Sequence, residues 1–282
     1  MAPQHRPHIL TIDLEDWFHC LEPNPRHWHQ FERRIEVEAD CLLELLDRHL
    51  AKATFFVLGD VAERSPHLIQ RIAGCGHEIG THGMLHEFVY RQTPDEFRED
   101  LQKSLRLLEA IVGTAVRAYR APYFSITRES LWALQILFEE GIRYDSSIFP
   151  IRNPRYGIPG ARRTPHLIER DLWECPVSVL PTPCGNIPFA GGVYQRFLPW
   201  RLIELAVGIL ERRREPVIVY LHPWELDPGQ PRHKTGSRFL RFRHYYGLRR
   251  TCEKLTRLLQ SARYVTLAEG IGALDAEGSE RG

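Results

Sequence analysis

Three carboxylates stand close together near the N-terminus, where an apolar segment ends. The stretch HILTIDLEDWFHC, residues 8–20, begins as an apolar run and then places Asp13, Glu15 and Asp16 directly before two large aromatic residues. Like charges at this spacing repel, and a half-buried carboxylate is costly without a cation or hydrogen-bond donors. The stretch therefore indicates a site at which these acids meet positive charge.

Two histidines offer the matching chemistry. His82 and His86 lie four residues apart in the segment THGMLH, and on a helical turn such side chains share one face. Two imidazoles and a carboxylate suit a borderline divalent cation. The spacing alone is weak evidence in a chain with 14 histidines, but the acids of residues 13–16 need a cation and the histidines need an anionic partner. Together they predict one metal site.

Two further polar residues follow apolar segments. Arg120 precedes Ala-Pro, which favours an extended backbone from which a guanidinium can hold a carboxylate ionised. His222 ends the apolar run PVIVYL and could act as a general acid near neutral pH. The alternatives are a surface ion pair for Arg120 and a histidine satisfied within the core for His222.

The elements that must position these residues alternate between strand and helix patterns. Strands are predicted at 8–14, 53–59, 77–83, 116–122, 144–150, 172–178, 216–225 and 263–271, and helices at 35–50, 67–76, 93–113, 127–141, 199–214 and 248–262. Repeated β-α-β units imply a parallel sheet covered by helices, and about seven such strands favour a distorted (β/α)7-type barrel over an open sheet.

Side chains that do chemistry in such barrels gather at the carboxyl ends of the strands. The acids of 13–16, the histidines of 82–86, the segment 120–123, Asp145 and His222 all meet that rule. We expect a single domain over residues 1–282. Its barrel is expected from about 8–150 and 170–272, with the Pro- and Gly-rich stretch 151–192 as an irregular excursion.

Composition excludes several function classes. The formal net charge of +1 and the absence of a phosphate-binding glycine motif argue against nucleic-acid and nucleotide binding. Six scattered cysteines without a C-x-x-C pair indicate neither a zinc knuckle nor a disulfide framework. The N-terminal residues show no apolar signal-peptide region, and no long apolar run predicts a transmembrane helix. The expected location is the cytoplasm, extending to the inner-membrane face.

The motifs in their order resemble the polysaccharide deacetylase family, the metal-dependent carbohydrate esterases with NodB homology. TID followed by acids, HGMLH, RAPY, YDSSIFP and YLHP resemble the family's five motifs and span residues 11–223. The stretches FAGGVYQRFLP and HPWELDPGQPR are similar to the branch associated with exosortase and exopolysaccharide loci in Gram-negative bacteria. That branch carries a C-terminal extension, here residues 225–250, expected to pack on the barrel.

The resemblance implies a role for each matched residue. Asp13 matches the catalytic base, His82 and His86 match metal ligands, and His222 matches the acid. Arg120 matches the residue that orients the base. The resemblance further places Tyr123 where a backbone N–H completes the oxyanion site and Asp145 where a carboxylate supports Arg120 or the base.

The first motif departs from the family pattern. The family has two adjacent aspartates, base and then ligand, whereas Leu14 intervenes here to give D-x-E-D. Glu15 faces the metal if the chain stays extended, because residues i and i+2 point the same way, and Asp16 does so if the chain turns. Asp16 is slightly preferred for its shorter reach, and a register with Glu15 as base and Asp16 as ligand stays open.

The expected reaction is hydrolysis of an acetyl group on an amino-sugar polysaccharide or its lipid-linked precursor, and an N-acetyl group is expected before an O-acetyl group. The cofactor is one divalent ion, Zn²⁺ first, with Co²⁺, Ni²⁺ or Fe²⁺ as alternatives. Peripheral association with a membrane biosynthetic complex is a further expectation. Related chemistry on a small amide and a non-catalytic glycan-binding role are the competing functions. The residues expected to contact the sugar are Trp17, Phe124, Gly192 and Trp224.

Overall fold

The centre of the molecule is a curled sheet of nine strands, seen in a computed structural model that describes residues 6–169, 171–233 and 237–279. Its strands are β1 (His8–Leu14), β2 (Thr54–Val57), β3 (Glu78–Thr81), β4 (Ala118–Tyr119), β5 (Tyr144–Asp145), β6 (His166–Glu169), β7 (Leu172–Glu174), β10 (Ile218–Leu221) and β11 (Tyr264–Val265). They follow one another across the sheet in the order β10-β1-β2-β3-β4-β5-β7-β6, and β11 pairs with the start of β1.

The pairing is parallel from β10 through to β7, and only the β6–β7 hairpin at the edge is antiparallel. Among the described residues, no strand ladder joins β7 to β10. Instead the Ser178 backbone N–H donates to Ile218 O at 3.0 Å, and Gly191 forms a bridge with Tyr220. The expected distorted barrel of mostly parallel strands is therefore confirmed. It is incompletely closed between β7 and β10.

β1 lies in the middle of this sheet and is buried over its whole length. Its apolar residues alternate between two clusters, Leu10 and Ile12 on one face and Ile9 on the other. Burial on both faces explains why β1, β2 and β10 read as continuous apolar runs, as parallel strands covered by helices do.

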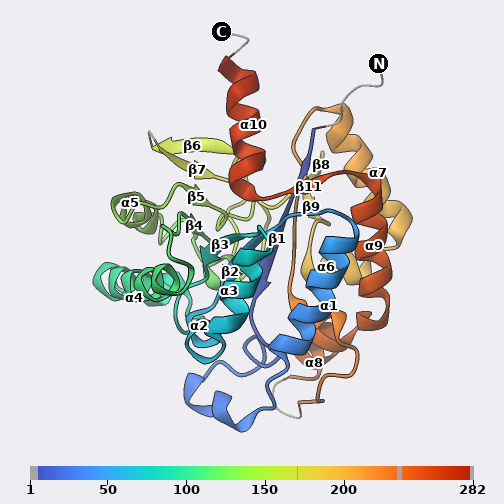
Figure 1. Ribbon diagram of the computed structural model, residues 1–282. Helices are drawn as coiled ribbons and strands as arrows, with labels where there is room; N and C mark the ends of the chain where they lie inside the picture. The colour runs from blue at the N-terminus through green and yellow to red at the C-terminus, as the bar shows by residue number, and fades with distance from the viewer. Residues whose placement is uncertain (1–5, 170, 234–236, 280–282) are drawn as a thin grey trace.

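Helices cover the outside of the sheet, as Figure 1 shows. They are α1 (Ile35–Arg48), α2 (Gly59–Arg64), α3 (Pro66–Gly74), α4 (Pro94–Val112), α5 (Trp132–Glu139), α6 (Gly192–Phe197), α7 (Trp200–Arg212), α8 (Arg238–Tyr245), α9 (Thr251–Ser261) and α10 (Leu267–Ser279). The longest, α4, begins at a capping box between Thr93 and Glu96 and ends at Gly113 in the left-handed conformation.

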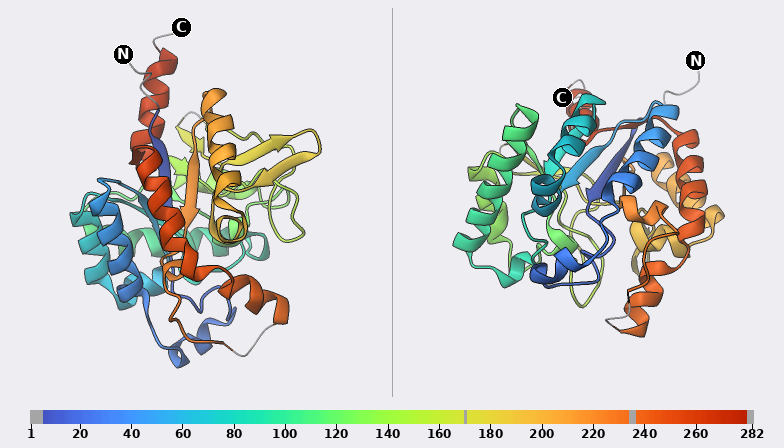
Figure 2. Two further views of the ribbon diagram at one scale, coloured as in Figure 1. Left: turned by 90° about the vertical axis from the view of Figure 1, so that its right-hand side faces the viewer. Right: turned by 60° about the horizontal axis from the view of Figure 1, so that its bottom comes forward.

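The stretch 151–192 has no regular structure up to residue 165 and then carries β6, β7 and a separate hairpin of β8 (Val179–Thr182) and β9 (Gly185–Pro188). Within residues 225–250, α8 lies at the end of the molecule to which the β1 arrow points, away from both termini (Figures 1 and 2). No helix in the described part of the chain is long and apolar enough to cross a membrane.

Candidate active site

The site lies at the carboxyl ends of β10, β1, β3 and β4, which belong to one run of parallel strands with β2 between β1 and β3. Asp13 is the second-to-last residue of β1, His82 follows β3, Arg120 follows β4, and His222 follows β10. Because all the strands from β10 to β4 are parallel, their carboxyl ends lie at one edge of the sheet, and Asp13, His82, His86 and His222 line one pocket there.

Asp13 and Arg120 form a buried pair in this pocket. Arg120 Nη1 donates to Asp13 Oδ1 at 2.7 Å, and both side chains are almost fully buried. The guanidinium is held on its other edges by Ser146, whose carbonyl and hydroxyl oxygens accept at 3.1 and 2.7 Å. The Phe56 ring lies 4.4 Å from the guanidinium carbon. Each guanidinium nitrogen of Arg120 therefore has an acceptor, and the pairing fixes the direction of the Asp13 carboxylate.

Glu15, His82 and His86 bring three ligand atoms within 4.8 Å of one another. Glu15 Oε2 lies 2.8 Å from His86 Nε2, and the three side chains are buried. The carbonyl oxygen of Arg120 lies 2.8 Å from His82 Nδ1. That bond fixes the proton on Nδ1, so that the Nε2 lone pair of His82 faces the other two ligands, as in metal-binding histidines.

These residues fit a divalent cation. Glu15 Oε2 is buried and has no hydrogen-bond partner, although His86 Nε2 is within contact distance. Burial would raise the pKa of Glu15, yet the neighbouring His86, His222 and His82 lower it well below its usual value. Burial also lowers the pKa of His82 to about 4, which keeps its imidazole neutral. An ionised carboxylate beside a neutral imidazole is the protonation state in which both bind a metal.

Asp16 does not join this group. Its Oδ1 accepts from the Trp17 N–H at 3.0 Å, and its Oδ2 accepts from the backbone N–H groups of Arg34 and Ile35 at 3.0 and 3.3 Å. The carboxylate therefore tethers the first turn of α1. Burial raises the pKa of Asp16 to about 6 despite these three donors. The sequence-based preference for Asp16 as metal ligand finds no support in this arrangement, which places Glu15 beside the histidines.

His222 stands on the opposite side of Glu15 within a chain of ion pairs. Its Nδ1 lies 2.8 Å from Glu225 Oε1, and Glu225 Oε2 lies 2.7 Å from Arg196 Nε. Its Nε2 lies 3.5 Å from Glu15 Oε1 and 3.8 Å from Asp13 Oδ2. Burial would lower the pKa of His222, but Glu225, Glu15 and Asp13 raise it above its usual value. A partly exposed imidazole with a raised pKa can donate a proton at neutral pH.

Loop backbone, not a helical turn, brings His86 to His82. Residues 82–88 contain no helix, and both Gly83 and His86 have positive φ, 73° and 55°. A Cβ at Gly83 would lie 2.9 Å from Asp100 Oδ2. Tyr123 and Phe124 also have positive φ, 56° and 53°. Strained non-glycine residues cluster at sites of function.

Asp145 is buried but makes no direct bond to Arg120 in the described structure. It accepts from the Ser147 hydroxyl, and it faces Glu174 across the sheet. Burial raises the pKa of Asp145 to about 6 and that of Glu174 far above its usual value, where Asp145 adds to the effect of burial. Asp145 therefore interacts with Arg120 through charge, because the Arg120 guanidinium lowers the Asp145 pKa against the effect of burial, and not through a hydrogen bond in the described structure.

The expected sugar-binding residues divide into two pairs. Phe124 and Trp224 line the pocket, and the Trp224 ring stacks on His222 with centroids 5.0 Å apart. Trp17 is only 2% exposed, and its indole N–H donates to Glu32 O. Gly192 packs on Tyr220, whose hydroxyl would lie 2.9 Å from an added Cβ. Trp17 and Gly192 thus belong to the packing around the site.

Several residues of the pocket were not identified from the sequence. Glu225 could have been, since it follows His222 by three residues in HPWE. The others come from the segment after β1, from the segment between β5 and β6, from α6, from β10 and from α8, and no motif in the sequence marks them. They are Cys20, Arg155, Tyr156, Arg196, Tyr220, Arg243 and His244.

Family models match most of the chain in two parts. A model described as polysaccharide deacetylase matches residues 31–138, which include His82, His86 and Arg120. A model described as a domain of unknown function, DUF3473, matches residues 146–271, which include His222 and α8. The second match fits the expected exopolysaccharide-associated branch with its C-terminal extension.

Curated relatives match over part of their length. A Bacillus cereus peptidoglycan-N-acetylglucosamine deacetylase is 38% identical over 95 residues, 33% of this chain and 34% of the relative. A Bradyrhizobium chitooligosaccharide deacetylase is 34% identical over 91 residues, 32% of this chain and 42% of the relative. The matches thus span well under two thirds of these relatives.

Solved structures share the fold. A Mycobacterium smegmatis protein assigned to the polysaccharide deacetylases superposes with a TM-score of 0.67 at 22% identity, over 99% of this chain and 93% of that one. A family 4 acetyl xylan esterase from Clostridium thermocellum, in complex with a cobalt ion, gives a TM-score of 0.51 at 18% identity over 94% and 90%.

Proposed function

Since residues 31–138 match the polysaccharide deacetylase family model, we propose that the chain is a metal-dependent hydrolase that removes N-acetyl groups from an amino-sugar polysaccharide or its lipid-linked precursor. The observation that carries the proposal is the convergence of Glu15, His82 and His86 beside the Asp13–Arg120 pair. The named activities of the Bacillus and Bradyrhizobium relatives support an N-acetyl substrate.

We assign Glu15, His82 and His86 as the residues that hold the cation. When bound, a divalent metal supplies a Lewis acid for the amide carbonyl and lowers the pKa of a water molecule. The cobalt complex of the related esterase supports a divalent ion of this kind. Zn²⁺ remains our first expectation because imidazole and carboxylate ligands suit it.

The protein side chains carry the proton transfers. Asp13, oriented by Arg120, accepts the proton of the attacking water. His222 donates from Nε2 to the departing amine, and Glu225 holds it by Nδ1 in the orientation for that transfer. We further assign the backbone N–H of Tyr123 as a donor to the oxyanion.

The pocket mouth favours a substrate with negative charge near the acetylated sugar. Arg155 and Arg243 line the pocket, and Arg155 is exposed. Arg196 also lines it, but Glu225 already pairs with Arg196. An acidic exopolysaccharide or a lipid pyrophosphate-linked oligosaccharide offers such charge. We place the reaction in exopolysaccharide synthesis, which the DUF3473 match supports.

The test is metal analysis combined with acetate release from a panel of acetylated oligosaccharides. We expect release that stops with chelator, returns with Zn²⁺ or Co²⁺, and is lost in His82→Ala. The exposed His29→Ala serves as the matched control and should keep full activity. Release only from small amides would favour the competing amidohydrolase, and full activity of metal-free protein would refute the proposal.

A further inference from the structure

We propose that Glu15, Cys20 and His222 form a second cation site, selective for thiophilic divalent ions such as Zn²⁺, back to back with the site of His82 and His86. The Glu15 carboxylate would serve both sites, one oxygen to each. The two groups share only this residue. The existence of the second site does not depend on the deacetylase reaction, whereas its inhibitory effect rests on the proposed function.

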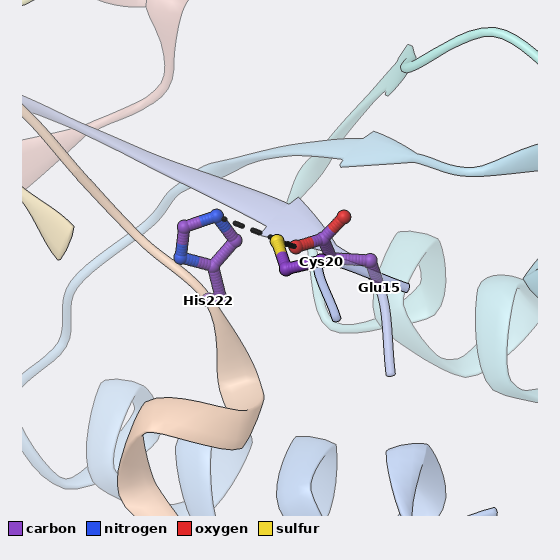
Figure 3. A group of neighbouring side chains, drawn as sticks. All are labelled: Glu15, Cys20 and His222. Atoms are coloured by element: carbon purple, nitrogen blue, oxygen red, sulfur yellow. Dashed lines mark hydrogen bonds and ion pairs between the residues drawn. The ribbon is translucent and has the colours of Figure 1, made fainter. Parts of the chain in front are cut away.

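The three donors converge on one point beside β1. Cys20 Sγ lies 2.7 Å from Glu15 Oε1, and the same oxygen lies 3.5 Å from His222 Nε2. All three ligand atoms lie within 4.8 Å of one another, and Figure 3 shows the side chains facing each other. Ligands of a tetrahedral zinc ion lie roughly 3.4–3.7 Å apart, so a shift of the thiol by about 1 Å suffices.

The two carboxylate oxygens of Glu15 point to different partners. Oε2 lies 2.8 Å from His86 Nε2, whereas Oε1 accepts from the Cys20 thiol and, at 3.4 Å, from the Trp224 indole N–H. A carboxylate with one oxygen on each side can bridge two cations. The first group offers only nitrogen and oxygen, and the second adds sulfur, which selects softer ions.

The remaining geometry favours occupation from solvent. Cys20, His82 and His222 line the same pocket, so an ion that reaches one group reaches the other. Glu225 holds His222 by Nδ1 and leaves Nε2 as the ring nitrogen that faces Glu15. On binding, the Cys20 S–H proton and the His222 Nε2 proton pass to solvent, and a lone pair on each atom takes the proton's place toward the ion, without any change of oxidation state.

Occupation of this site would block the reaction. The Nε2 atom of His222 is the proton donor of the proposed function, and an ion on that atom removes it. We therefore expect excess Zn²⁺ to inhibit an enzyme that a first equivalent of Zn²⁺ activates, and we expect Cys20 to set the inhibitory concentration.

Cobalt spectroscopy tests the site without reference to activity. The parent for the test carries serine at the four exposed cysteines, Cys41, Cys75, Cys184 and Cys252. Titration of this metal-free parent with Co²⁺ should give a near-ultraviolet thiolate-to-cobalt charge-transfer band with the second equivalent and none with the first. Adding Cys20→Ser should abolish the band and leave the first equivalent bound. Buried Cys175 is common to both proteins.

Either of two results would overturn the second site: no thiolate band in the parent, or the same band after Cys20→Ser. Retention of the first equivalent shows that the variant is folded. In the activity assay, the Zn²⁺ concentration for half-inhibition should rise at least tenfold in Cys20→Ser, each protein being normalised to its own uninhibited rate. If the band behaves as expected but no substrate is turned over, the proposed function fails and the second site stands.

A separate surface supports a second inference. The α8 surface, defined by Phe197, Phe239, Phe242 and Tyr246, exposes large aromatic side chains beside the pocket. Phe239 is 74% exposed and Phe242 54%, and the rings of Phe197 and Tyr246 stack with centroids 4.3 Å apart. Isolated exposed aromatics are ordinary, but the rings of Phe197, Phe242 and Tyr246 contact one another, and a contiguous group of this kind marks an interaction site.

The charge around this surface identifies its partner. Residues 237–250 contain no acidic residue, and Arg238, Arg249 and Arg250 are exposed there. On the same helix, Leu240, Arg243 and His244 line the catalytic pocket. The helix lies at the far end of the molecule from both termini (Figure 2). We infer that the α8 surface docks on an anionic lipid bilayer, with the pocket mouth next to the lipid headgroups.

Vesicle co-sedimentation of the full chain tests this docking. We expect binding to phosphatidylglycerol-containing vesicles, little to pure phosphatidylcholine, and loss in high salt. Phe239→Ser with Phe242→Ser should weaken binding at least tenfold, whereas Leu131→Ser, which changes an exposed apolar residue beside α5, should leave it unchanged. Equal binding to neutral vesicles, or undiminished binding of the double variant, would refute docking on anionic lipid. Absence of vesicle binding would also refute it, and would leave a protein as the partner of this surface.

Discussion

Glu38 is a buried acid whose neutralisation should change the pH dependence of stability. It lies on α1 with 1% of its surface exposed, and neither carboxylate oxygen has a hydrogen-bond partner in the described structure. Burial, followed by the neighbouring carboxylates of Asp16 and Asp227, raises the pKa of Glu38 to about 10. The folded protein therefore keeps this side chain protonated at neutral pH.

The magnitude follows from proton linkage. The unfolded chain loses the Glu38 proton near its ordinary pKa of 4.5, whereas the folded chain keeps it up to about pH 10. Between these values the unfolded state binds fewer protons, so the free energy of unfolding falls by about 1.4 kcal/mol for each pH unit. At pH 7.5 this amounts to roughly 4 kcal/mol relative to acid conditions. Glu38→Gln has nearly the same shape and no such proton.

Urea unfolding of metal-free protein at pH 7.0 and 8.5 measures this effect. The free energy of unfolding of Glu38→Gln minus that of wild type should be about 2 kcal/mol larger at pH 8.5 than at pH 7.0. The free-energy cost of burying the amide of the variant is the same at both pH values and cancels in this comparison. Asp16, whose pKa is about 6, is largely ionised at both pH values. Glu44→Gln, at an exposed position of the same helix, is the control and should show no slope. A difference that does not change with pH would show that Glu38 is ionised in the folded state.

Three further substitutions probe the pocket. Arg120→Ala should lower the free energy of unfolding by about 3–5 kcal/mol in urea melts and abolish acetate release, because it leaves Asp13 buried without its cation. Gly83→Ala should cost about 1–3 kcal/mol in the same melts, since it needs positive φ and places a methyl group 2.9 Å from Asp100 Oδ2. Arg243→Gln should raise KM for an acidic acetylated oligosaccharide at least tenfold and leave KM for a neutral one nearly unchanged, and an equal rise for both would refute a charge-reading role.

The sequence predicts the pocket well where residues follow the ends of apolar strands. Asp13, His82, Arg120 and His222 each end such a run, and parallel neighbours place those ends together. The order of these strands can be predicted without a specific motif, because consecutive strands from β1 to β5 pair with each other along the sheet. The convergence of these four positions is therefore a consequence of topology.

Residues whose position depends on distant packing were not predictable in the same way. Gly192 was expected at the substrate, but its missing side chain accommodates Tyr220 of β10. The orientation of Trp17 depends on Glu32, which accepts from its indole N–H. Arg243 reaches the pocket through α8, whose place beside it depends on contacts such as the hydrogen bond between His244 and Gln230 at 2.8 Å. No local pattern around any of these residues carries that information.

The three carboxylates at the end of β1 each lie beside a different kind of positive or hydrogen-bond-donating group, which offsets the repulsion between them. Asp13 meets a guanidinium, Glu15 meets imidazoles, and Asp16 meets the backbone N–H groups that begin α1. The chain turns directly after β1, where the Glu15 N–H donates to Asp13 O at 3.0 Å. This turn sends Glu15 and Asp16 to different partners. The extra methylene of glutamate extends its reach to the histidines, so the added residue in the first motif and the change from aspartate to glutamate are one structural adjustment. On this reasoning Leu14 acts as a spacer: it stays in the core, while Glu15 on its far side lies beside His86.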